Sequence, residues 1–139
     1  MATDRYQHGL DKMMEYMPKG NSGAASHLKL ADDLKDIAPD VTRYMVEFAF
    51  ADIYARPGLT KQEQALVTIS SLVTLGTEPQ LELHINTGLT VGLSKEQITA
   101  AIIHLLPYTG FPRVLNALAI IKNVFAERDA DDAPETQAG

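Results

Sequence analysis

A run of eleven residues without a single charged side chain, from Ala65 to Leu75, most constrains the fold of this chain. It follows Thr60-Lys61-Gln62-Glu63, a capping box in which the hydroxyl and the carboxylate satisfy free amide groups at a helix start. A helix begun at this point has no charged face to present to water. We therefore predict a central, buried helix that starts near Lys61.

Other segments also carry helical rather than strand-like spacing of apolar residues. Ser94-Lys95-Glu96-Gln97 is a second capping box and predicts a helix from about Lys95, which Pro107 should end. Pro79 fits the first turn of another helix, where its missing amide hydrogen costs nothing. Strand-like alternation is absent, so we expect an all-α, single-domain bundle of about six to seven helices. The remaining helices are expected over residues 6–17, 27–37, 39–55 and 111–127.

Charge and length set the broad class of protein. The chain has 139 residues and a formal net charge of −6, and much of that charge lies in residues 127–139. We expect a helical domain over residues 1–128 and an acidic, flexible tail over 129–139. The nearly neutral body offers no basic surface for nucleic acid. No stretch is apolar and long enough for a signal peptide or a membrane span, which predicts a cytoplasmic protein.

The absence of cysteine removes whole classes of chemistry. With no Cys in the sequence, disulfides, thiolate metal sites and Cys-based redox or nucleophilic mechanisms are excluded. No HExxH motif, EF-hand pattern or Gly-rich phosphate loop occurs either. We expect neither a metal nor an organic cofactor.

His84 is the first candidate for acid or base chemistry. It lies with Thr77, Gln80 and Thr87 on a polar stripe beside the apolar positions of the helix that Pro79 begins. A histidine at the edge of an apolar face is well placed to exchange protons in a pocket. The alternative is a half-exposed helical histidine that is hydrogen-bonded to Gln80 or to water.

Glu47 and Arg56 are the other charged residues that stand out. Glu47 lies within an apolar and aromatic run, where burial would raise its pKa so that it could hold a proton, although a surface position is equally consistent. Arg56 follows Asp52 by four residues and precedes Pro57, so it could pair with Asp52, cap the helix or bind a substrate carboxylate. His8 and His27 have charged neighbours and are expected at the solvated surface.

Large apolar faces on so small a chain predict an oligomer, because monomers rarely leave such faces in water. Four segments, residues 47–59, 64–68, 75–86 and 107–118, together resemble the carboxymuconolactone decarboxylase family. This resemblance implies an all-helical, alkylhydroperoxidase D-like fold assembled as trimers or hexamers. In the thiol-dependent branch of that family, a Cys pair precedes a histidine; those two positions fall on Thr77 and Gln80 here, so thiol peroxidase activity is excluded.

The resemblance implies a cofactor-independent decarboxylase that acts on a small carboxylated lactone or keto acid. In such a reaction Arg56 or Tyr108 would orient the carboxylate, Thr77 or Gln80 would stabilise the developing negative charge, and His84 or Glu47 would deliver the proton. Two alternatives stay open. One is a lactone hydrolase or isomerase with His84 as general base, and the other is a non-enzymatic helical oligomer that binds a small molecule or a protein.

Overall fold

Every regular element in the computed structural model is helical over the residues it describes, 4–17 and 27–132. Within these residues seven helices are longer than one turn, as the sequence predicted for an all-α domain. The elements in chain order are α1 (Asp4–Met14), α2 (His27–Asp33), α3 (Val41–Tyr44), the π-helix η1 (Met45–Tyr54), α4 (Lys61–Leu75), α5 (Glu78–Thr90), α6 (Lys95–His104), α7 (Leu106–Thr109) and α8 (Phe111–Asp132).

Both capping boxes form as predicted and fix the starts of α4 and α6. The Glu63 amide donates to Thr60 Oγ1 at 3.1 Å, and the Thr60 amide donates to Glu63 Oε1 at 2.9 Å. Ser94 and Gln97 make the same reciprocal pair. Because both partners of each box lie within four residues, local sequence decides these two boundaries.

Other boundaries differ slightly from the expected ones. Pro79 lies in the first turn of α5, as predicted, but α6 ends at His104 and Pro107 lies in the first turn of the short α7. Helix α8 continues to Asp132, past the expected start of a flexible tail at Asp129, and Asp129 pairs with Lys95. The rest of that expected tail, residues 133–139, lies outside the described residues.

The helix expected over residues 39–55 begins at Val41, and most of it is a π-helix. In η1 the backbone bonds join residues five apart; at its end the Ala55 amide donates to the Phe50 carbonyl at 3.1 Å. Such i→i+5 winding is rare and brings residues five apart onto the same side of the helix. This winding determines which acidic side chains of η1 point together.

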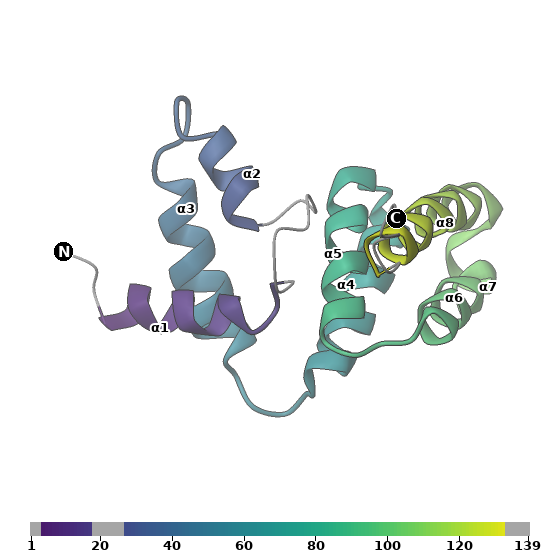
Figure 1. Cartoon of the computed structure of the whole chain (residues 1–139), viewed down its shortest axis with the longest axis horizontal. Helices are drawn as coiled ribbons and strands as arrows, with labels where there is room; N and C mark the ends of the chain where they lie inside the picture. Colours follow the sequence, from purple (N-terminus) through teal and green to yellow (C-terminus); the bar gives the residue numbers. More distant parts are fainter. Residues whose placement is uncertain (1–3, 18–26, 133–139) are drawn as a thin grey trace, which may run out of the picture.

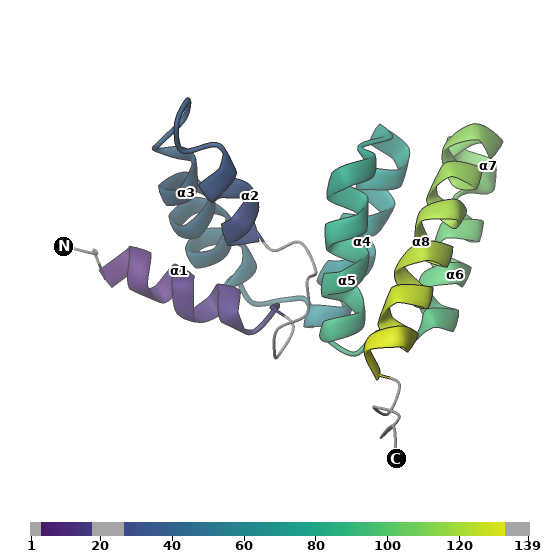
Figure 2. The same cartoon turned by 45° about the horizontal axis from the view of Figure 1, so that its top comes forward.

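The helices form two groups, which lie on opposite sides of the molecule in Figures 1 and 2. In the first group α3 and η1 form one continuous helix, against which α1 and α2 pack, with a small core made by Met13, Tyr16, Val46 and Phe50. In the second group α4 to α8 enclose a larger apolar core. Gln64 joins the two, since the Tyr16 hydroxyl donates to its Oε1 at 2.6 Å and its Nε2 donates to the Tyr54 carbonyl at 3.0 Å.

Helix α4 is only half buried, which corrects the expectation of a fully covered central helix. Its inner face, with Ile69 and Val73, packs into the larger core, but Val67 and Leu75 are 60% and 65% exposed. The neighbouring helices cover one side of α4 and leave the other side open in a single chain. Further apolar side chains are exposed on α7 and α8, among them Tyr108, Phe111 and Leu115. Within the described residues no helix is both long and apolar enough to cross a membrane.

Candidate active site

Helix α5, which carries His84, is held firmly by its surroundings. Leu81 and Ile85 are buried in the larger core on either side of His84 in the sequence. From α8, Arg128 donates through Nε to Asn86 Oδ1 at 2.9 Å and through Nη2 to the Asn86 carbonyl at 2.6 Å. A positively charged donor such as Arg128, bonded to a carbonyl near the carboxyl end of α5, stabilises that end of the helix. His84 is therefore presented by a rigid backbone.

The His84 side chain is half-buried and packs against a second imidazole. Its ring centroid lies 4.9 Å from that of His27, with the two planes at 73°. His27 begins α2, is only 9% exposed, and makes a second edge contact with Phe50 at 5.2 Å. The expectation that His27 is a solvated surface residue was thus wrong. Its charged neighbours Lys29 and Asp32 are exposed, whereas His27 is covered by a ring from a helix far along the chain.

Burial controls the protonation of this imidazole pair. Removal from water lowers the pKa of His27 to about 4, because burial disfavours the charged ring. The pKa of His84 is also lowered to about 4, first by burial and second by the neighbouring His27. Both rings are therefore neutral near pH 7. Within residues 4–17 and 27–132 neither ring makes a hydrogen bond or an ion pair.

The neutral pair should make the fold sensitive to mild acid. The folded-state pKa of each ring, about 4, lies below its ordinary value of 6.5, so the unfolded chain binds more protons between these values. The stabilisation is complete above pH 6.5 and is lost as the pH falls towards 4. We expect the free energy of unfolding to drop by at least about 3 kcal/mol across this window.

Guanidinium unfolding measured at pH 7.0, 5.5 and 4.5 checks this expectation, because these values of roughly 4.5 to 7 cover most of the interval in which the unfolded chain binds more protons. The variant His27→Phe serves as the control and should show a shallower dependence on pH. An equally steep dependence in that variant would assign the acid sensitivity to other groups.

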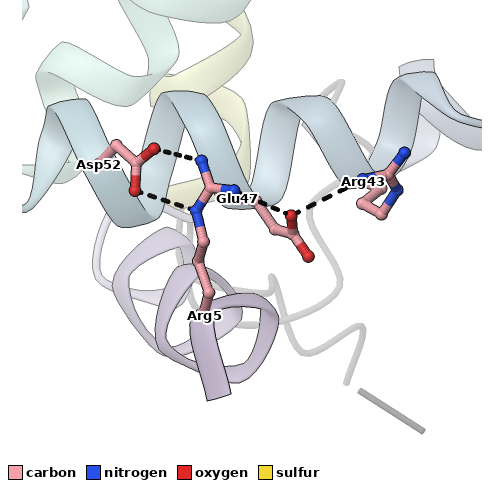
Figure 3. Close-up of polar contacts among 4 residues, drawn as sticks. All are labelled: Arg5, Arg43, Glu47 and Asp52. Carbon is pink, nitrogen blue, oxygen red and sulfur yellow. Dashed lines mark hydrogen bonds and ion pairs between the residues drawn. The ribbon is translucent and has the colours of Figure 1, made fainter. Parts of the chain in front are cut away.

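Glu47 is buried, as one of the two expectations for it required, and it is part of an ion-pair cluster between α1 and η1 (Figure 3). Its Oε2 lies 3.4 Å from Nη1 of Arg5 and 3.9 Å from Nη1 of Arg43. Arg5 also binds both carboxylate oxygens of Asp52, through Nε at 3.1 Å and through Nη2. The π-winding explains the cluster, because residues five apart in η1 lie on one side and share one guanidinium.

This cluster changes the interpretation of two sequence predictions. Asp52 pairs with Arg5 of α1 rather than with Arg56, so the structure does not support the Asp52 pair among the three alternatives for Arg56. Glu47 is balanced by two guanidinium groups, which favours a role in anchoring α1 and α3 to η1. The ion pairs of Glu47 reach α1 and α3, whereas the ring contact of His84 is with His27 on α2.

Substitution Glu47→Gln should lower the free energy of unfolding by about 1 kcal/mol, because it removes the buried anion that pairs with Arg5 and Arg43, while Arg5 keeps its second partner Asp52. The figure is smaller than for a fully buried pair because Arg5 and Arg43 are themselves half exposed. Urea denaturation followed by circular dichroism measures the loss. The exposed acid on α5, Glu82→Gln, is the matched control and should change stability little; equal effects from both would remove the anchoring role.

Arg56 borders a groove of about 460 Å³ between the end of η1 and α4. The groove combines apolar walls with a cation and the polar side chains of Gln64 and Thr68, which suits a small molecule that carries a carboxylate. Tyr54 lines it and stacks on Phe50 at 4.5 Å, and Phe50 in turn contacts His27. His84 itself is not among the lining residues. The full lining is Ile53, Tyr54, Arg56, Pro57, Gly58, Leu59, Gln64, Val67 and Thr68.

The other residues predicted for the site lie apart from one another in a single chain. Thr77 and Gln80 are exposed at the amino end of α5, up to two turns before His84, and the Thr77 side chain does not cap the helix. Tyr108 is 76% exposed and lies 5.8 Å from the His104 ring. In the described part of the chain, no contact joins Tyr108 or Arg56 to His84. No group of three His, Asp or Glu residues in that part is placed to bind a metal ion.

Comparison with known proteins assigns the family. The model of the carboxymuconolactone decarboxylase family matches residues 39–123, from before α3 into α8. The chain belongs to the carboxymuconolactone decarboxylase family. The matched region includes η1, Arg56, α4 and the whole of α5, so it contains His84 and the groove at Arg56.

Three proteins similar to this carboxymuconolactone decarboxylase family member indicate what its relatives do. A 4-carboxymuconolactone decarboxylase of Acinetobacter baylyi is 30% identical over 131 residues, which are 94% of this chain and 92% of the relative. An uncharacterized 15.0 kDa protein of Paracoccus denitrificans is 27% identical over 93% of this chain and 99% of its own length. A nitrosuccinic acid decarboxylase of Metarhizium robertsii is 25% identical over 55% of this chain and 53% of its own.

Proposed function

We propose that this protein is a cofactor-independent decarboxylase of a small carboxylated lactone or keto acid, with His84 as proton donor. The observation that carries the proposal is a half-buried imidazole, neutral near pH 7, on the rigid α5 of a cysteine-free family member. Two relatives are named as decarboxylases of carboxylic acids, which supports the reaction type. Lactone, keto and nitro groups all withdraw electrons, and this is the property that stabilises the carbanion left by loss of CO₂.

The chemistry needs one bond to break and one to form. The bond between the substrate carbon and its carboxylate breaks, CO₂ leaves, and the electron pair spreads onto the neighbouring electron-withdrawing group. Protonated His84 then delivers its proton to the carbon and returns to its neutral form, which completes the product. In the empty site His84 is neutral, but a carboxylate placed beside it raises the proton affinity of the ring. Binding of an anionic substrate thus favours protonation of His84, the proposed proton donor.

The remaining predicted residues have supporting roles in this proposal. Arg56 orients the carboxylate in its groove, and Thr77 and Gln80 donate hydrogen bonds to the developing negative charge near the start of α5. Tyr108 is too exposed to enclose a substrate in its own chain, so we propose that it contributes from a neighbouring subunit of a trimer or hexamer. Glu47 acts at a distance by holding η1, the helix that leads into Arg56.

One observation favours a second function. A neutral imidazole can accept a proton directly, without first being protonated. His84 could therefore serve as the general base of a lactone hydrolase or isomerase. The products separate the two reactions, since a decarboxylase releases CO₂, a hydrolase adds water and an isomerase leaves the mass unchanged.

The full chain can be tested directly with 4-carboxymuconolactone, nitrosuccinate and a simple β-keto acid as substrates. Mass spectrometry and a CO₂ electrode follow the products, and we expect stoichiometric CO₂ from at least one acid. Addition of water or isomerisation without CO₂ would overturn the decarboxylase in favour of the general-base alternative. No reaction with any of them would favour the non-enzymatic binding protein.

Arg56→Met should raise KM for the active acid about tenfold and leave kcat nearly unchanged, because the lost guanidinium holds substrate and transition state alike. Steady-state kinetics at fixed ionic strength provide the measurement. The control Lys122→Met removes one exposed positive charge on α8 and should change neither constant. A fall in kcat at constant KM would place Arg56 in the chemical step instead.

A further inference from the structure

His27 occupies a position that neither the sequence nor the family match singles out, since the matched region begins after it. Its ring is held on one side by Phe50, at 5.2 Å and 82°, and meets His84 on the other at 4.9 Å and 73°. Phe50 is 1% exposed and stacks on Tyr54, so it cannot move aside. The His27 ring is thereby fixed in edge contact with the proposed proton donor.

The buried His27 ring would destabilise the fold if packing were its only role. His27 is 9% exposed, and within the described residues its ring nitrogens have no hydrogen-bond partner. A buried polar group in that state destabilises a fold, whereas a leucine or phenylalanine would pack against Phe50 without the penalty. A second observation points the same way, because the contact joins the two groups of helices: His27 lies on α2 of the first group and His84 on α5 of the second.

We propose that His27 is a positioning residue for His84: its ring fixes the orientation of the His84 imidazole and shields it from water. This inference rests on the proposed function for its catalytic meaning, but the contact itself can be tested without a substrate.

The proposal predicts that His27 controls the pKa of His84. The ring responds to burial and to His27, and to no other charged group in the described chain. Of the helices packed against α5, α8 directs Arg128 to Asn86 and Thr90. Helices α4 and α6 face it with the apolar residues Ile69 and Ile98. Removal of the His27 ring should therefore admit water and move the pKa of His84 back towards its ordinary value.

NMR titration of the ring protons of His84 in the full chain tests this. The variants are His27→Gln, which removes the ring, and His27→Phe, which keeps a ring of similar shape; His8→Gln on exposed α1 is the matched control. We expect the pKa of His84 to rise by about one unit or more in His27→Gln, and to stay low in His27→Phe and in the control. Circular dichroism establishes that each variant is folded.

Kinetics complete the test with the acid found to be turned over. In His27→Gln we expect kcat to fall about tenfold or more at nearly constant KM, with most activity restored in His27→Phe. An unchanged titration of His84 in His27→Gln, or a changed titration with unchanged kcat, would overturn the positioning role. If the wild-type chain turns over no acid, the proposed function fails, while the titration still decides whether His27 governs His84.

Discussion

Replacement of His84 by glutamine should lower kcat for decarboxylation by about 100-fold or more, with a much smaller change in KM. Glutamine can donate a hydrogen bond but cannot deliver a proton to carbon, and general acid catalysis typically contributes a factor of this size. In our proposal Arg56 supplies most of the binding energy for the substrate carboxylate, so substrate binding should survive the loss of His84. Single-turnover CO₂ release separates the chemical step from binding and from product release.

The pH dependence of the wild-type enzyme adds a sharper criterion. A proton donor must be protonated in the complex, so kcat should fall as the pH rises through the pKa of His84 with substrate bound; a general base gives the opposite slope. His104→Gln, which alters an exposed histidine on α6, is the matched control and should keep full activity. Full turnover in folded His84→Gln would remove His84 from the reaction altogether.

Gly9→Ala should destabilise the protein by about 3 kcal/mol, although alanine is the better helix former. A Cβ at position 9 would lie 2.1 Å from the carbonyl oxygen of Val46 and 2.8 Å from its carbonyl carbon. Both atoms belong to the backbone of η1 and cannot rotate away as a side chain would, so α1 as a whole has to move away from η1. That movement would loosen Met13 and Tyr16 in the small core.

Chemical denaturation gives the loss from the midpoint and slope of the transition. The control is His8→Ala, an exposed position one residue earlier on α1, which should be neutral or slightly stabilising because of helix propensity. If Gly9→Ala is as stable as this control, then α1 does not pack on η1 as closely as the structure shows.

The predictions that were confirmed rest on interactions between residues close in the sequence. The capping boxes at Thr60 and Ser94 need only four residues each, and Pro79 needs only its own ring to favour a first turn. The family match follows from similar local patterns and agrees with the resemblance seen in the sequence. The apolar neighbours of Glu47 in the sequence were consistent with either a buried or a surface position, and the structure shows that Glu47 is buried.

The amino-acid sequence by itself determined an all-helical chain, the starts of its main helices, its family and the choice of His84 as the leading candidate. The tertiary structure alone decided that His27 covers His84, that Arg5 binds Asp52 across 47 positions, and that one face of α4 stays open. The reason is physical. A cap or a helix start is satisfied by neighbours along the chain, whereas the protonation and orientation of an imidazole depend on whatever the fold packs against it.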